Sequence, residues 1–433
     1  MVQDSKNQPT PENPGATMNA ARTMRKRPLD GIRVLDLSRV LAGPWCTQNL
    51  ADLGAQVIKI ERPGTGDDTR TWGPPFLRDT EGRDTSESAY FLCANRNKQS
   101  VAIDMSSPEG AALIREFAKS CDVVVENFKV GGLKKYGLDY ESLSALNPRL
   151  VYCSITGFGQ SGPLSQRAGY DFLIQGMGGL MSITGEPDSV AGGGPEKVGV
   201  AVTDLMAGMY ATTGVLAALM ERQKSGLGQH VDIALLDCQL AMLANQSMNY
   251  LTTGIAPQRM GNAHPNIVPY QTFATSDGHV IVACGNDSQF RSLCTAMNVP
   301  ELALDVRFAT NSGRSVNRAE LLPQLAAVFM TRPRDAWVDA LEACGVPCGP
   351  INDIAQAFDS EQAQFRGAAR EIPHPVAGVA PTVASPLRLS ATPVAYDQAP
   401  PMLGQHTSAM LRDVLGMTDV QIEALVQTGV IGS

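Results

Sequence analysis

Apolar positions between residues 33 and 60 form two short runs separated by a segment of helical spacing. Arg33–Leu37 and Gln56–Ile60 have the length and composition of buried strands. Between them, Pro44–Leu53 has helical spacing, with its proline near the first turn, where a missing N–H costs nothing. This order predicts a strand–helix–strand unit of Rossmann-like length.

The same pattern recurs further along the chain. Ser100–Asp104, Asp122–Glu126 and Leu150–Ile155 suit strands of a buried parallel sheet. A helix is expected to open at Ser107, which supplies a cap and is followed by proline and glutamate. We therefore predict an α/β fold with a Rossmann-like large domain.

Length and charge narrow the class of protein. A chain of 433 residues is too long for one small core, so two domains are expected. The 35 basic and 43 acidic residues give a net charge of −8, without the basic excess of a nucleic-acid-binding protein. The mean hydropathy of −0.08 argues against a membrane span. The odd number of cysteines, nine, mostly far apart, indicates reduced thiols in the cytoplasm.

The first 27 residues differ from the rest of the chain. They are polar and rich in proline and asparagine, which is typical of a disordered tail. They have no apolar core of a secretory signal, and Asp4 and Glu12 disfavour a transit peptide. Met18 or Met24 is an alternative start.

Several kinds of cofactor site are disfavoured. The turn after the first predicted strand has one glycine where a dinucleotide fold needs G-x-G-x-x-G, and the chain has no P-loop. Its five histidines match no metal-ligand spacing, so no metal is expected. Arg62 follows the second strand, where such folds approach a ribose; a surface arginine is the alternative interpretation. His264 lies in a loop-like string that can line a site.

Two carboxylates, Asp171 and Asp204, stand where loops enter predicted helices. The ordinary interpretation is a helix cap, with Thr203 or Asp204 capping the helix that follows. However, the apolar segment Gly199–Val202 has the character of a strand. A carboxylate between a buried strand and a helix would be partly desolvated, and the helix dipole would keep it ionised. Such a carboxylate can act as a nucleophile.

The chain resembles the family III CoA-transferases (CaiB/BaiF family) from Pro28 to about Ile431. The segments that carry the resemblance are PLDGIRVLDLSRVLAGP, LGAQVIKIERPGTGDDTR, NRNKQSVAIDM, DVVVENF, SITGFGQSGP, GYDFLIQGMGGLMSITG, GVAVTDLMAGMYA, GVPCGPI and LGQHT. Within the family, GDDTRTWGPPF, NRNK, SQRAGYD and IVPYQ are most similar to the type that uses succinyl-CoA and glutarate.

The resemblance implies an interlocked, ring-like homodimer. Its large Rossmann-like domain would combine both ends of the chain, and a smaller α+β domain would come from the middle. The expected boundaries are 28–230 for the first part of the large domain, 231–251 for a helical linker, 252–340 for the small domain and 341–433 for the return.

The resemblance also implies a mechanism. Asp204 matches the aspartate that forms an acyl anhydride and then a CoA thioester before CoA passes to the acceptor acid. No cofactor is permanently bound, and CoA thioesters are substrates. The expected CoA-binding residues are Leu41, Ala42, Arg62, Ile103, Asn127, Phe128, Lys135, Arg167 and Tyr170. The expected acceptor-side residues are Asp171, His264 and Arg70.

Three departures from the family pattern bear on specificity. Asn127–Gly131 lacks the proline of the usual N-F-x-P-G, and Lys135 stands where arginine is common. The glycine-rich loop of formyl-CoA transferases is replaced by residues 264–268, which disfavours oxalate. An arginine clamp for a dicarboxylate, such as glutarate, itaconate, citramalate, mesaconate or an aryl-succinate, would draw on Arg39, Arg70, Arg96 and Arg167.

Two other functions are compatible with a CoA-binding fold of this kind. A 2-methylacyl-CoA racemase of this fold has histidine in a G-H-D segment, where this chain has Gly169-Tyr170-Asp171. A phenol, with a pKa of about 10, is a poor base near neutral pH, which disfavours the racemase. A non-catalytic CoA-binding protein is the third hypothesis, and the intact segment around Asp204 argues against it.

Overall fold

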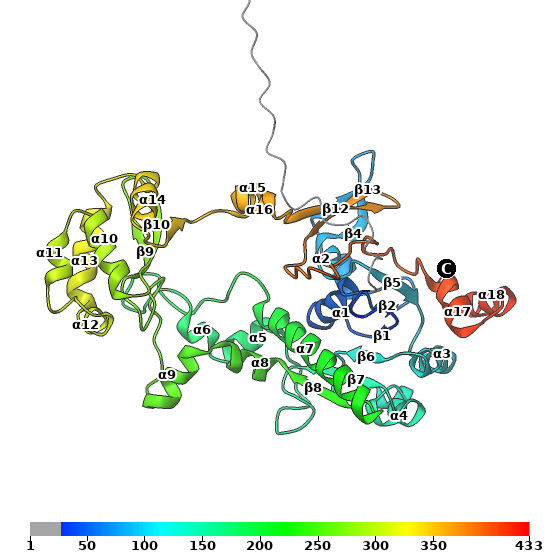
Figure 1. Cartoon of the computed structure of the whole chain (residues 1–433). Coiled ribbons are helices and arrows are strands. Elements are labelled where there is room, and N and C mark those ends of the chain that lie inside the picture. Colours follow the sequence, from blue (N-terminus) through cyan, green and yellow to red (C-terminus); the bar gives the residue numbers. More distant parts are fainter. Residues whose placement is uncertain (1–26, 433) are drawn as a thin grey trace, which may run out of the picture.

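The computed structural model describes residues 27–432, so the expected disordered tail lies outside them except for Arg27. The described chain forms a larger and a smaller unit, joined by two separate connections in a ring-like path (Figure 1). Both ends of the described chain belong to the larger unit, as the resemblance implied.

A parallel sheet of six strands lies at the centre of the larger unit, in the order β5-β2-β1-β6-β7-β8. The strands are β1 (Arg33–Asp36), β2 (Gln56–Glu61), β5 (Lys98–Ala102), β6 (Val123–Glu126), β7 (Val151–Thr156) and β8 (His230–Ala234). When these six strands are numbered by their order in the chain, the sheet has the strand order 3-2-1-4-5-6 of dinucleotide-binding Rossmann folds. The predicted α/β class is confirmed. The order reverses between β1 and β6, where ligands of such sheets bind at the carboxyl ends.

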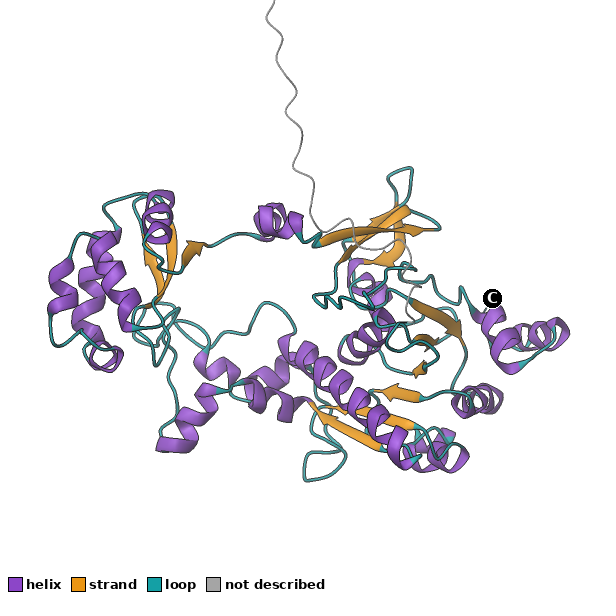
Figure 2. Ribbon diagram, in the orientation of Figure 1, coloured by secondary structure: helices purple, strands orange, loops and turns teal. Residues whose placement is uncertain are grey.

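Helices cover both faces of the sheet (Figure 2). One face packs against α1 (Ala42–Asp52), α5 (Asp171–Met177), α7 (Val202–Ser225) and α8 (Leu235–Met242). The other packs against α3 (Pro108–Lys119), α4 (Tyr140–Leu146), α17 (Thr407–Leu415) and α18 (Asp419–Gln427). Ala102 N–H donates to Thr407 Oγ1 at 3.0 Å, and Ile103 pairs with Ile431. The carboxyl-terminal segment is therefore part of the large unit's core.

Helix α7 is long and apolar enough to cross a membrane by length and composition. Its small residues Ala207 and Ala211 are fully buried, and it packs against α1, β7 and β8. Its apolar character therefore belongs to the core of the large unit.

The smaller unit is an antiparallel sheet, in the order β11-β10-β9, with helices packed on it. Its elements are β9 (Tyr270–Ala274), β10 (His279–Ala283), α10 (Asp287–Ala296), α11 (Pro300–Leu304), α12 (Asn311–Val316), α13 (Arg318–Phe329), α14 (Arg334–Ala343) and β11 (Cys348–Pro350). The predicted boundary at residue 340 was too early, because it falls inside α14 and β11 still pairs with β10.

The predicted helical linker at 231–251 was wrong in its first part. Val231–Ala234 pairs with β7 as the edge strand β8. Helices α8 and α9 (Asn245–Thr253) follow. The helical conformation is interrupted between them at Ala244, whose φ is 46°.

The remaining elements are short. They are the 3₁₀ turns η1 (Asp68–Thr71) and η2 (Lys134–Tyr136), strands β3 (Phe76–Arg78), β4 (Asp84–Ser88), β12 (Ala369–His374) and β13 (Gly378–Val383), and helices α2 (Ala89–Leu92), α6 (Leu180–Ile183), α15 (Ile354–Asp359) and α16 (Glu361–Phe365).

Candidate active site

The loops after β1 and β6 are tied together at the point where the strand order reverses. Arg39 N–H donates to Asn127 Oδ1 at 2.9 Å, and Asn127 Nδ2 donates to Arg39 O at 2.6 Å. Val40, between them and α1, has a φ of 70°, and its N–H donates to Asp67 Oδ1 at 3.2 Å. A β-branched residue keeps this conformation only when its surroundings hold it, and such residues cluster at ligand sites.

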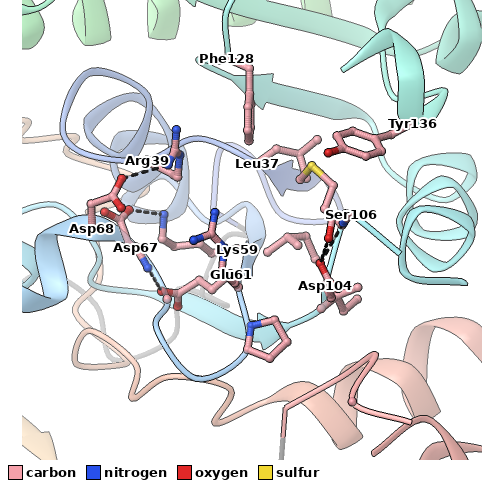
Figure 3. A pocket seen from close by; sticks show the side chains of 17 residues that line it. Leu37, Arg39, Lys59, Glu61, Asp67, Asp68, Asp104, Ser106, Phe128 and Tyr136 are labelled. Atoms are coloured by element: carbon pink, nitrogen blue, oxygen red, sulfur yellow. Dashed lines mark hydrogen bonds and ion pairs between the residues drawn. The ribbon is translucent and has the colours of Figure 1, made fainter. Parts of the chain in front are cut away.

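Two adjoining cavities open at these loops. The first, of about 680 Å³, reaches from the loops after β1 and β6 to the first turn of α7. The second, of about 510 Å³, lies at the ends of β2 and β5 (Figure 3). Both are lined by Arg39, Asp68, Phe128 and Tyr136. Together they form one elongated site around the reversal point of the sheet.

Each of the predicted CoA-binding residues lines one of these cavities. The first cavity is lined by Leu41, Ala42, Asn127, Phe128, Lys135, Arg167 and Tyr170, together with Asp204. The second is lined by Arg62, Ile103 and Phe128. The structure therefore brings together residues that lie far apart in the sequence.

The predicted acceptor-side residues line neither cavity. Arg70 is buried, forms ion pairs with Glu61 at 2.8 Å and Glu87 at 3.0 Å, and lies over the ring of Phe91. His264 belongs to the loop before β9, where its Nδ1 accepts hydrogen bonds from the backbone. The carboxylate of Asp171 accepts a hydrogen bond from Thr203 N–H, in the first turn of α7.

The expected arginine clamp is reduced by the same burial. Arg96, like Arg70, is buried and paired, with Asp52 at 2.6 Å. A buried, fully paired guanidinium is committed to the fold, since separating the pair leaves a charge without a partner. Arg39 and Arg167 remain as cavity-lining members of the set.

Asp204 lies inside the first turn of α7 rather than at its cap. The helix begins at Val202 and its capping residue is Ala201, so the predicted caps, Thr203 and Asp204, were wrong. The strand expected at Gly199–Val202 is also absent, because these residues form a bend and then helix, with Val200 57 % exposed. Burial by other elements, rather than a preceding strand, desolvates Asp204.

Electrostatics distinguish Asp204 from ordinary surface carboxylates. Burial raises the pKa of its carboxyl to about 7, and the negative charge of Asp171 adds to the shift. The sequence predicted that the helix dipole would keep this group ionised; burial and Asp171 outweigh that effect. A carboxylate with a raised pKa is more basic and more nucleophilic when it ionises.

Close backbone contacts hold the cavity walls in place. A Cβ on Gly157 would lie 2.6 Å from Gly169 Cα, so the loop after β7 and the loop that carries Tyr170 meet backbone to backbone. A Cβ on Gly208 would lie 2.7 Å from Ala42 O, so α7 approaches the start of α1 equally closely. These contacts explain two glycine-containing segments of the sequence.

Sequence reasoning missed some of the lining residues. Asp68 accepts from Arg39 Nη1 at 2.9 Å and lines both cavities, as does Tyr136. Asp68 belongs to the G-D-D-T-R segment, which gave a signal. Gly429 also lines the second cavity, and only the return of the chain end brings it there. Within residues 27–432, no three His, Cys, Asp or Glu side chains gather as metal ligands would.

The chain has relatives among known sequences. The profile of "CoA-transferase family III" matches residues 29–407. The chain belongs to this family. It is 50% identical over 390 residues to the succinate–glutarate CoA-transferase of Agrobacterium fabrum, covering 90% of this chain and 96% of that protein. It is 44% identical over 405 residues to the succinyl-CoA:glutarate CoA-transferase of Mus musculus, covering 94% and 90%.

Solved structures agree with this family assignment. A CaiB/BaiF family protein from Brucella suis is 50% identical and superposes with a TM-score of 0.78, covering 90% of this chain and all of that one. The chain is therefore a family III CoA-transferase with the CaiB/BaiF fold.

Proposed function

We propose that this CoA-transferase moves CoA from succinyl-CoA to glutarate, with Asp204 as the nucleophile. The observation that carries the proposal is the position of Asp204, which is half-buried in the wall of a cavity whose lining includes most of the predicted CoA-binding residues. The identity to enzymes named for succinyl-CoA and glutarate supports the choice of substrates.

The chemistry is a series of acyl exchanges. A carboxylate oxygen of Asp204 attacks the thioester carbonyl, the C–S bond breaks, and CoA leaves as a thiolate. The thiolate attacks the aspartyl carbonyl of the anhydride and releases succinate. A carboxylate oxygen of glutarate attacks the aspartyl-CoA thioester, whose C–S bond breaks to give an aspartyl–glutaryl anhydride and the CoA thiolate. The thiolate attacks the glutaryl carbonyl, which forms glutaryl-CoA and releases Asp204 as a carboxylate. One thioester replaces another, so no ATP is needed.

Cations along the site suit the substrates. Arg62 in the second cavity is available to the phosphate-bearing end of CoA. Arg39, Lys135 and Arg167 line the first cavity, and Arg39 and Arg167 have the planar fork that pairs with a distal carboxylate.

A screen of free dicarboxylic acids against succinyl-CoA identifies the preferred acceptor. The new CoA esters are detected by mass spectrometry.

Trapping of the acyl-enzyme tests the mechanism. Protein incubated with succinyl-CoA and hydroxylamine should carry a hydroxamate on Asp204, because hydroxylamine attacks the activated aspartyl carbonyl. We expect no such adduct in Asp204→Ala, whereas Asp237→Ala, which changes an exposed acid in the first turn of α8, should behave as wild type. An undiminished adduct yield in Asp204→Ala would contradict the proposal.

The racemase alternative has a separate readout. Tyr170 stands in place of the racemase histidine and is 68 % exposed. We expect no exchange of the α-hydrogen of a 2-methylacyl-CoA in heavy water.

We also infer that the protein is cytoplasmic and forms a homodimer. Free thiols on all nine cysteines are consistent with a cytoplasmic location.

A further inference from the structure

The first turn of α7 carries Asp204 but has no capping side chain of its own. Its capping residue is Ala201, whose methyl group cannot accept a hydrogen bond. The first N–H groups of a helix have no partner within it, and Thr203 here is fully buried. Acceptors for this turn must come from another element.

Asp171, at the start of α5, supplies the acceptor. Its Oδ1 accepts from Thr203 N–H at 2.8 Å and, less closely, from Asp204 N–H at 3.4 Å. Its Oδ2 accepts from Gln175 Nε2 at 2.7 Å. Both carboxylate oxygens are therefore used inside the protein, and Asp171 does not line the cavity.

Two buried amides complete the support. Gln175 Oε1 accepts from Val198 N–H at 2.9 Å, which fixes the segment that leads into α7. On the other side, Thr203 Oγ1 donates to Gln239 Oε1 of α8 at 2.6 Å. Both glutamines are fully buried. The turn that carries Asp204 is thus held by α5 and α8.

Charge links the same two carboxylates. After burial, the charge of Asp171 is the second cause of the raised pKa of Asp204. The pKa of Tyr90, on α2, is raised to about 12 by burial and by Asp204. None of the other ionisable side chains on the packed elements is a cause of the Asp204 shift. They are Cys46 and Asp52 on α1, Tyr152 and Cys153 on β7, His230 and Asp232 on β8, and Asp237 and Cys238 on α8.

We infer that Asp171 is a positioning residue for Asp204, which it orients through the first turn of α7 and opposes with its own negative charge. The inference rests on the proposed function. When Asp204 forms a C–O bond to the acyl carbon and the thiolate leaves with the C–S electron pair, Asp204 loses its charge. Repulsion from Asp171 is then relieved, so Asp171 favours the acylated over the free enzyme.

Neutral variants separate the two contributions. Asp171→Asn and Asp171→Ser keep an oxygen acceptor for Thr203 N–H but remove the charge, and Asp171→Ala removes both. Single-turnover release of CoA is measured against pH. Attack needs ionised Asp204, so the wild-type rate should rise with a midpoint near its pKa of about 7. In Asp171→Asn and Asp171→Ser we expect this midpoint at lower pH.

The size of the rate loss tests positioning. In Asp171→Ala, where Thr203 N–H has lost its acceptor and the turn that carries Asp204 is held less firmly, we expect a plateau rate roughly fivefold lower than in the two neutral variants, which is about 1 kcal/mol of activation free energy. Asp237→Asn is the matched control and should keep the wild-type profile. Circular dichroism identifies the variants that fold.

Outcomes distinguish the two proposals. A wild-type enzyme without an adduct on Asp204 would reject the proposed function itself. An adduct on Asp204 together with an unshifted midpoint in the folded neutral variants would overturn the role of Asp171 alone. A shifted midpoint in these variants and a lower plateau in Asp171→Ala would support it.

Discussion

Glu126 is a buried carboxylic acid at the end of β6, with no ion pair among the described residues. Its Oε2 accepts from Phe128 N–H at 2.7 Å, so it helps to shape the turn that carries Asn127 and Phe128. Burial raises the pKa of this carboxyl to about 7. The group is therefore expected to be largely protonated in the folded protein at pH 6.

The titration of Glu126 predicts a pH dependence of stability. Because the folded pKa is raised, the stability due to its protonated form is complete below the unfolded pKa of about 4.3 and is lost as pH rises through 7. Glu126→Gln keeps an acceptor for Phe128 N–H and cannot ionise. We expect it to be more stable than wild type at pH 8, by at most about 4 kcal/mol, and similar at pH 4.

Urea unfolding at several pH values measures this difference. Glu221→Gln, at an exposed position of α7, is the control and should follow wild type at each pH. Equal pH slopes in Glu126→Gln and wild type would mean that Glu126 does not titrate as its burial indicates.

At the scale of elements, the contact of α1 with α7 positions the first cavity. A Cβ at Gly208 would lie 2.7 Å from Ala42 O, a backbone atom that cannot move without moving the cavity wall. Gly208→Ala gains about 1 kcal/mol of helix propensity but costs about 1–3 kcal/mol of overpacking. We expect lower stability and a severalfold higher KM for succinyl-CoA.

Gly214→Ala, in the same helix, is the matched comparison. Its Cβ would meet Val231 Cγ1, the end of a side chain on an edge strand, at 2.8 Å. A side chain can shift where backbone cannot, so we expect a change in thermal stability close to zero or positive and an unchanged KM. Similar effects of both variants would show that close approach at Ala42 has no special role.

Local sequence patterns predicted the strands whose apolar runs and flanking residues are close together in the chain. Arg33–Leu37, Gln56–Ile60, Ser100–Asp104 and Asp122–Glu126 overlap the observed strands because apolar runs and their flanking caps are local features. Val231–Ala234 was mistaken for helix because its pairing with β7 depends on residues about eighty positions earlier. The cap of α7 was missed for the same reason, since it comes from Asp171.

The candidate site was predicted unevenly. The cavity-lining set came from the resemblance and from loops at strand ends, which topology brings to one edge. Arg70 and Arg96 were misjudged because sequence does not reveal that each has a buried carboxylate partner. Whether an arginine is buried and paired depends on segments that come into contact only in the folded chain, as Arg96 and Asp52 do.

At the scale of the whole molecule, the returning connection has features that a single chain does not explain. Helices α15 and α16 have six and five residues, and neither contains a buried residue. Helices this short are unstable by themselves. Their apolar side chains Ile354 and Phe365 are 79 % and 87 % exposed. These short helices lie between the two units (Figure 1), where a second copy of the chain can cover them.

The proposed homodimer therefore predicts an effect of Phe365→Asp. Burying one phenylalanine contributes about 2 kcal/mol, and a two-fold symmetric dimer has two such contacts. Losing about 4 kcal/mol weakens the dimer roughly a thousandfold. Because interlocked subunits must assemble as they fold, both proteins are refolded from urea at low micromolar concentration. In size-exclusion chromatography with light scattering, wild type should then have twice the 46.0 kDa mass of one chain, and the variant should have a single-chain mass. Val420→Asp changes an exposed position of α18, a helix at the outer side of the large unit, and this variant should remain dimeric. A Phe365→Asp protein that refolds to the dimer mass would place the contact between subunits elsewhere.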